Sequence, residues 1–105
     1  MGYRSEVILG IPPKQKENMD KIQNKHGQIF KLAKEHKDMI IYEGNYLKWC
    51  SGFDDVNDIT KFIEELWDKD EECCFIVAIG EDGVVHSELG HYYDYVGIYT
   101  THEIY

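Results

Sequence analysis

The chain has 105 residues, with 11 lysines and arginines against 20 aspartates and glutamates, a net charge of −9. A composition that is 43% hydrophobic and 13% aromatic provides enough apolar surface for one core, so we expect a single α+β domain over residues 1–105 rather than a disordered chain. No apolar run approaches the roughly 18 residues of a membrane span, and the N-terminus lacks the order of a signal peptide, which predicts a cytoplasmic protein.

The N-terminal half is predicted to contain a strand, a helix and a hairpin. Residues 3–11 alternate and end in β-branched residues, which favours a strand that Pro12-Pro13 stops. Residues 14–37 are predicted to form one helix, because apolar and semi-apolar residues recur at helical spacing. These residues are Met19, Ile22, His26, Ile29, Phe30 and Ala33. Two short strands, 39–43 and 46–50, are expected to pair around a tight turn at Gly44-Asn45.

The C-terminal half is predicted to contain a second helix and three strands. The helix begins at Asp54-Asp55, where Asp55 and Asp58 can accept hydrogen bonds from the first-turn amides, and ends in the charged stretch 68–72. Its apolar stripe is Val56, Ile59, Phe62, Ile63, Leu66 and Trp67. The apolar run 73–79 suits a central strand, and a turn at 80–83 leads to strand candidates at 84–88 and 95–104.

The order β-α-β-β-α-β is typical of the ferredoxin-like split βαβ fold. We therefore expect an antiparallel sheet with two helices on one face, extended by a C-terminal β-hairpin. Three cysteines, Cys50, Cys73 and Cys74, suggest neither a disulfide framework nor a zinc site, and are interpreted as buried reduced thiols.

No catalytic motif is present in the sequence, and no cofactor is expected. Gly80-Glu-Asp-Gly83 carries acids where a phosphate-binding loop would avoid them, and no serine lies in a nucleophile elbow. The best candidate for metal or acid–base chemistry is the group His86, Glu88, His91 and Asp94. Its spacing fits no established zinc pattern, and solvent-exposed loop histidines beside tyrosines are the more common explanation.

Charge is distributed unevenly along the chain. Residues 1–53 hold nine Lys/Arg and six Asp/Glu, a net of +3, whereas residues 54–105 hold two Lys/Arg and fourteen Asp/Glu, a net of −12. Acids along the second helix and the turns that follow it resemble a row of phosphates in sign and spacing, and would be attracted to a basic nucleic-acid channel. The acidic residues predicted to bind such a partner are Asp54, Asp58, Glu64, Glu65, Asp68, Asp70, Glu71, Glu72, Glu81 and Asp82. Direct binding of nucleic acid is disfavoured.

Two other interpretations of this charge remain open. Acidic surfaces also serve simply to keep small proteins soluble. Lysines of the predicted first helix, at positions 14, 16, 21, 25, 31, 34 and 37, could instead pair with the second helix.

Tyrosine is concentrated near the C-terminus. Five of the eight tyrosines lie in the last fourteen residues, and tyrosine is enriched in protein interfaces, so Tyr92 and Tyr93 are added to the predicted partner-binding residues. Packing of these tyrosines against the sheet is an equally good explanation. Trp49 and Trp67 are expected in the core.

Several segments resemble a group of small proteins encoded by tailed bacteriophages and prophages. These are the opening Met1-Gly-Tyr-Arg-Ser-Glu-Val7, Tyr46-x-Lys48-Trp49, Asp54-Asp55-Val56-x-Asp58-Ile59, and the strand and turn 75–82. The resemblance implies a phage accessory protein, a class that includes inhibitors of host defence such as anti-CRISPR proteins.

Three functions follow as hypotheses. The first is a non-enzymatic inhibitor that mimics nucleic acid and occupies the basic channel of a host immune effector, such as a CRISPR effector. The second is a small metal-dependent enzyme acting on a nucleotide or phosphoester through His86, His91 and Asp94. The third is a virion assembly or structural protein that forms homodimers through exposed sheet edges.

Overall fold

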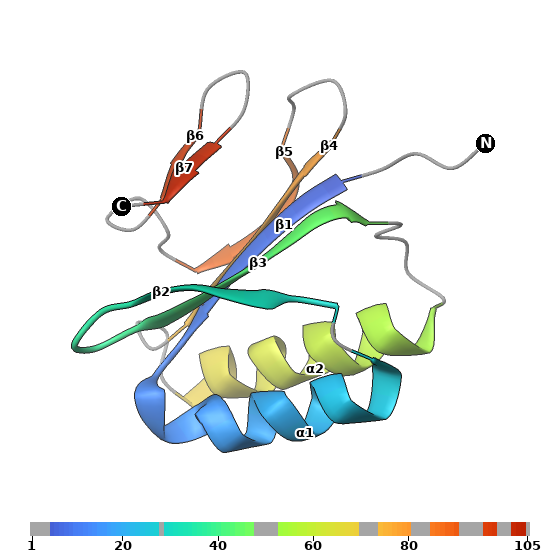
Figure 1. Cartoon of the computed structure of the whole chain (residues 1–105), viewed down its shortest axis with the longest axis vertical. Helices are drawn as coiled ribbons and strands as arrows, with labels where there is room; N and C mark the ends of the chain where they lie inside the picture. The colour runs from blue at the N-terminus through green and yellow to red at the C-terminus, as the bar shows by residue number, and fades with distance from the viewer. Residues whose placement is uncertain are drawn as a thin grey trace.

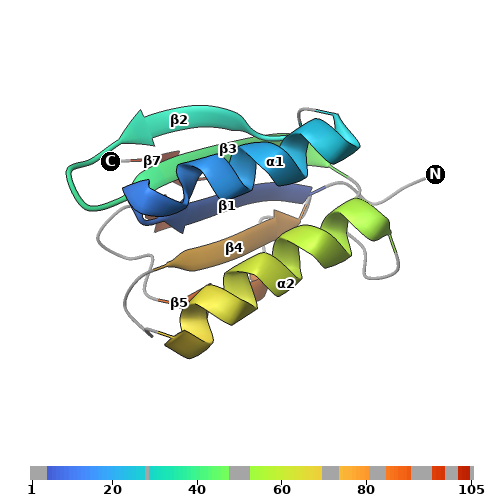
Figure 2. The same ribbon diagram turned by 90° about the horizontal axis from the view of Figure 1, so that it is seen from below.

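Strand and helix segments alternate along the chain and build a five-stranded antiparallel sheet with two helices (Figure 1). The computed structural model describes residues 5–27, 29–47, 53–69, 74–80, 85–90, 96–98 and 102–104. The strands of the sheet are β1 (Ser5–Ile11), β2 (Lys31–Glu35), β3 (Ile40–Leu47), β4 (Phe75–Gly80) and β5 (Val85–Gly90), in the order β2-β3-β1-β4-β5. The helices α1 (Lys16–His26) and α2 (Asp54–Lys69) cover the same face, as Figure 2 shows, and a short 3-10 helix, η1 (Pro13–Gln15), precedes α1.

The central strands bury residues on both faces of the sheet because their apolar side chains alternate between two cores. Val7, Leu9 and Ile11 of β1 pack on the helix side, whereas Ile8 joins a second cluster with Phe75 on the other side. This second face is covered in part by two short strands, β6 (Val96–Ile98) and β7 (His102–Ile104), which pair with each other above the sheet in Figure 1. The apolar run of β4 predicted a covered strand inside the sheet. This is confirmed, because all six residues of β4 are buried and β4 lies between β1 and β5.

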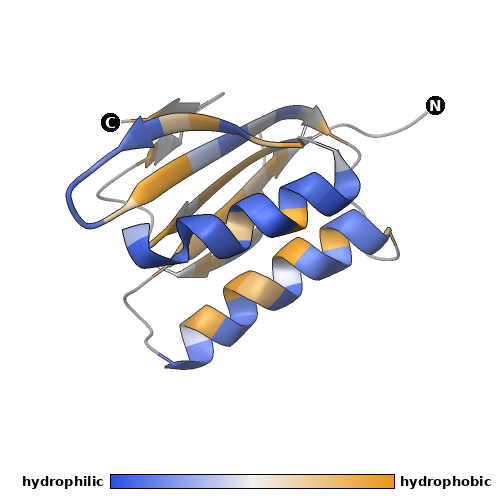
Figure 3. Ribbon diagram, turned by 60° about the horizontal axis from the view of Figure 1, so that its bottom comes forward, coloured by the Kyte–Doolittle hydropathy of each residue, from blue (hydrophilic) through white to orange (hydrophobic). Residues whose placement is uncertain are grey.

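Helix α2 confirms the predicted helix in the C-terminal half. Val56, Ile59, Ile63 and Leu66 are buried, while Phe62 and Trp67 are partly buried against the same core. By contrast, α1 buries only Met19 and Gln23, and Figure 3 shows it almost wholly in the colours of hydrophilic residues. Few buried side chains therefore anchor α1: Met19 lies in the core with Ile22 packed against it, and the last turn bonds to α2.

The predicted helix over 14–37 is wrong beyond His26. Gly27 has φ of 78°, a conformation that side chains disfavour, and it ends α1. The chain then turns back as β2, whose Cα positions pair with β3 from Lys31 opposite Glu43 to Glu35 opposite Ile40. Lys-Leu-Ala-Lys-Glu consists of good helix formers, but pairing with β3 overrides that local preference.

The predicted turn at Gly44-Asn45 is also wrong. Residues 40–47 form one unbroken strand, in which Gly44 lies opposite Val7 of β1. A Cβ atom at Gly44 would lie 2.5 Å from Cδ1 of Leu47 and 3.0 Å from the ring of Phe30, so glycine serves close packing here rather than a turn. The true hairpin joins β2 to β3, where the backbone amide of His36 donates to the carbonyl oxygen of Met39 at 2.7 Å.

The C-terminal segments pair differently from the expected hairpin of 84–88 with 95–104. β5 pairs with β4 in the main sheet, and the segment predicted as one strand over 95–104 contains the two strands β6 and β7.

Trp49, Cys50 and Cys73 lie outside the described residues, as do residues 81–83 of the predicted turn at 80–83. Cys74 is buried as expected, with its thiol donating to the carbonyl oxygen of Ile63 at 3.5 Å.

Candidate functional site

The outer face of α2 presents four exposed carboxylates, which we call the α2 acidic face. They are Asp54, Glu64, Glu65 and Asp68. They point away from the core because the apolar stripe of the helix occupies its opposite side. None of the four forms an ion pair with another residue in the described part of the chain, although Lys61 is exposed on the same helix. Four of the predicted partner-binding acids thus share one solvent-exposed surface.

Asp58 behaves differently from the other predicted acids. Its Oδ2 atom lies 2.6 Å from Nε2 of His26 and 3.1 Å from Nζ of Lys25, both on the last turn of α1. The hydrogen bond with His26, followed by that with Lys25, lowers the pKa of Asp58 below its usual 3.8. The carboxylate is therefore used to join the helices, as the interpretation of internal charge pairing expected. It does not bond to the first-turn amides; instead Asp55 accepts from the amide of Val56 at 2.8 Å.

The remaining predicted partner-binding residues cannot be assigned to a surface. Asp70, Glu71, Glu72, Glu81, Asp82, Tyr92 and Tyr93 all lie outside the described residues. The α2 acidic face is consequently the described portion of the predicted site.

The histidine and carboxylate group near the C-terminus is described only in part. His86 and Glu88 belong to β5, and Glu88 is exposed, whereas His91 and Asp94 lie outside the described residues. Within the ranges that the structure describes, no three His, Cys, Asp or Glu side chains come together as metal ligands.

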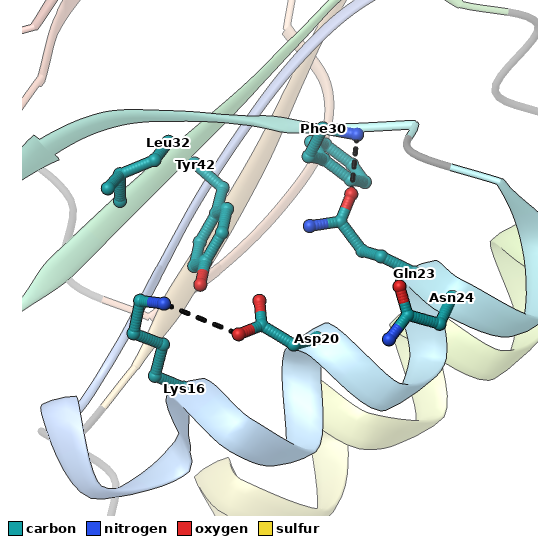
Figure 4. A pocket seen from close by; sticks show the side chains of 7 residues that line it. All are labelled: Lys16, Asp20, Gln23, Asn24, Phe30, Leu32 and Tyr42. Atoms are coloured by element: carbon teal, nitrogen blue, oxygen red, sulfur yellow. Dashed lines mark hydrogen bonds and ion pairs between the residues drawn. The ribbon is translucent and has the colours of Figure 1, made fainter.

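A cleft between α1 and the β2–β3 hairpin was not anticipated from the sequence (Figure 4). Its volume is about 330 Å³. One wall is polar and comes from α1, with Lys16, Asp20, Gln23 and Asn24. The other wall is largely apolar and consists of Phe30, Leu32 and Tyr42. The cleft forms because the chain turns back after α1 and continues as β2 beside β3, instead of extending the helix.

Tyr42 forms the inner end of this cleft. Its side chain is 2% exposed, and its hydroxyl points towards Asp20 and Lys16 in Figure 4. The Asp20 carboxylate acts on the hydroxyl through its charge and through a weak hydrogen bond, although the pair falls outside standard hydrogen-bond geometry. Burial and then the negative charge of Asp20 raise the pKa of Tyr42 to about 12, so the hydroxyl is protonated at neutral pH.

The other side chains of the α1 wall are held by hydrogen bonds. Nζ of Lys16 lies 3.3 Å from Oδ2 of Asp20, one helical turn away. Gln23 is 2% exposed, and its Oε1 accepts from the backbone amide of Phe30 at 2.8 Å. This bond orients the Gln23 amide so that its nitrogen points into the cleft (Figure 4). The only sequence signal for the cleft is the tyrosine that interrupts the apolar run Met39-Ile-Ile-Tyr42.

Comparisons with protein families, with curated proteins and with solved structures found no match to this chain. Neither helix in the described ranges has the length and apolar character needed to cross a bilayer. The function must therefore be inferred from the surfaces of the molecule itself.

Proposed function

We propose that this protein acts by binding a macromolecule through the α2 acidic face and not by catalysis. The observation that carries the proposal is the exposure of Asp54, Glu64, Glu65 and Asp68 without an ion pair to any described residue. Unpaired surface carboxylates leave a field that attracts a basic partner and repels nucleic acid. The partner proposed is a protein with a basic nucleic-acid channel, such as a CRISPR effector of a bacterial host, reached in the cytoplasm.

The spacing of the carboxylates supports mimicry of nucleic acid. Glu64 and Asp68 are four residues apart on one helix, which separates them by slightly more than one turn, or about 6 Å along the axis. Arg and Lys side chains that bind successive phosphates can bind carboxylates at such a spacing through charge-assisted hydrogen bonds. Together with the resemblance to phage accessory proteins, this supports an inhibitor that competes with nucleic acid for its partner.

We further infer that the domain is a variant of the ferredoxin-like fold. The strand order β2-β3-β1-β4 and the two helices on one face support this assignment, with β5 as an additional strand beside β4. The outer position of α2 in this arrangement leaves the acidic face open to a partner.

The experiment compares two variants with the same change in charge. Glu64→Lys/Asp68→Lys alters the α2 acidic face, whereas Glu17→Lys/Asp38→Lys alters exposed acids elsewhere, and each raises the net charge of −9 by four. Tagged wild-type protein and both variants are used for capture from a bacterial lysate, and captured proteins are identified by mass spectrometry and tested for nucleic-acid binding.

We expect the wild type and the control variant to capture a nucleic-acid-binding protein and to compete with its nucleic acid in a salt-sensitive manner. The α2 variant should lose both properties while keeping its circular dichroism spectrum. Equal capture by both variants, or a captured partner that still binds nucleic acid in the complex, would refute the proposal.

A further inference from the structure

The cleft between α1 and the β2–β3 hairpin combines features of a small-molecule site. A volume of about 330 Å³ lies within the range of ligand pockets, roughly 300–1,000 Å³. The Tyr42 hydroxyl is buried at its inner end beside the Asp20 carboxylate, with which it interacts without forming a hydrogen bond of standard geometry. A ligand group placed in the cleft could therefore offer this hydroxyl a better-aligned partner.

The two charges of the cleft restrict the type of ligand. Lys16 and Asp20 lie 3.3 Å apart, so a purely anionic ligand is repelled by Asp20 and a purely cationic one by Lys16. A molecule that carries both charges can place each one next to its opposite. The Lys16–Asp20 pair does not oppose this, because the two side chains are 44% and 45% exposed and such pairs contribute little to stability.

The apolar wall indicates the remainder of the ligand. Leu32 is 46% exposed, one of two exposed large hydrophobic residues in the described part of the chain, and it lies across the cleft from α1. An aliphatic group placed against Leu32 would remove apolar surface from water.

We propose that this cleft binds a free zwitterionic α-amino acid with an apolar side chain. The ligand carboxylate accepts hydrogen bonds from the Tyr42 hydroxyl and the Lys16 ammonium, and the ligand ammonium donates to the Asp20 carboxylate. The Gln23 amide, fixed by its bond to the Phe30 backbone, offers a further donor to the carboxylate. The side chain packs on Leu32. This site is independent of the α2 acidic face.

The first test uses three probes that share the leucine side chain and differ in charge at the backbone groups. L-leucine carries both charges, L-leucinamide only the positive one, and N-acetyl-L-leucine only the negative one. In NMR titrations of the intact protein, we expect L-leucine to shift the amide signals of residues lining the cleft, with a Kd on the order of 1 mM or tighter. Each single-charge analogue should bind at least about 10-fold more weakly. Absence of saturable shifts with L-leucine, or equal binding of either analogue, would overturn the proposal.

The second test separates ligand binding from folding. Tyr42→Phe removes the hydroxyl but keeps the ring, so the variant should be at least as thermally stable as the wild type while its affinity for L-leucine falls about 5-fold or more. Asp20→Asn should weaken L-leucine binding, whereas Glu17→Gln, an exposed position on the same helix outside the cleft, should not. Unchanged affinity in both Tyr42→Phe and Asp20→Asn would show that the cleft is not the site.

Discussion

Nε2 of His26 lies 2.6 Å from Oδ2 of Asp58, which joins the last turn of α1 to the second turn of α2. His26 is 13% exposed and Asp58 37% exposed, so the contact is partly shielded from water. The residues are 32 positions apart in the sequence. Together with the bond from Nζ of Lys25 to the same oxygen at 3.1 Å, this contact joins the two helices by polar interactions.

The first prediction is that Asp58→Asn lowers stability in a pH-dependent manner. The pKa of Asp58 is lowered in the folded chain, so its contribution is present above the usual 3.8 and is lost as the pH falls through the folded pKa. Urea unfolding should show the variant to be less stable than the wild type at pH 7, with the difference shrinking below pH 3.8. Glu64→Gln, a mid-helix exposed acid, is the control and should change little. A difference that persists undiminished in acid would contradict the assignment to this carboxylate.

The second prediction concerns Tyr42 in alkaline solution. Its pKa is raised from 10.0 to about 12, so ionisation of the unfolded chain does not oppose folding below pH 10 but lowers stability progressively as the pH rises from 10 towards 12. Wild-type protein should therefore lose more stability than Tyr42→Phe between pH 9 and 11, as measured by urea unfolding. An ultraviolet titration should show one late-ionising tyrosine in the wild type that Tyr42→Phe lacks. Identical titration curves would argue against a buried hydroxyl at this position.

The third prediction tests the packing between the two central strands. Gly10 of β1 lies opposite Phe75 of β4, and a Cβ atom at Gly10 would lie only 2.2 Å from Cε2 of that ring. Gly10→Ala should therefore destabilise the protein by about 1–3 kcal/mol through overpacking. Phe75→Leu opens space at the same point, so in a double-mutant cycle the combined variant should lose less than the sum of the two single changes. Strict additivity would mean that the clash is relieved elsewhere.

The fourth prediction concerns the exposed edge of the sheet. All five residues of β2 are exposed, and its pairing with β3 is irregular between Leu32 and Lys34. Short length, lysines and an irregularity protect edge strands from pairing with other chains. Lys34→Ile should promote self-association, detected as a concentration-dependent increase in sedimentation coefficient. Lys21→Ile, an exposed lysine of α1, serves as the control. If both variants sediment like the wild type, the lysine is not what protects the edge.

The elements predicted correctly are those whose own sequence shows which of their residues are buried. α2 has an apolar stripe at helical spacing, and β4 is an apolar run, so each could be identified without knowing its neighbours. β2 has no such pattern, because it is solvent-exposed along its whole length and its strand conformation comes from β3. A segment of this kind takes its structure from the strand with which it pairs, and its local propensity then predicts the wrong element.

The same distinction applies to the functional residues. The exposure of Glu64 and Asp68 follows from their positions opposite the stripe of α2 and could be predicted. The pairing of Asp58 with His26 could not, since it depends on how two helices pack. The role of Tyr42 in the cleft could not be predicted for a related reason. A tyrosine in an apolar strand normally packs in the core, and only the folded structure shows that its hydroxyl lies at the cleft beside α1 without a hydrogen bond of standard geometry.

β1 is the first strand along the described chain and occupies the middle of the sheet, between β3 and β4. The contacts with β4 join residues 5–10 to residues 75–80, a separation that carries a large loop-closure entropy. During synthesis the sheet cannot be completed until β4 has left the ribosome, and until then β1 has one open side. Closure of this β1–β4 contact should therefore limit the folding rate, so the order of the strands, more than the helices, sets how fast this domain reaches its native state.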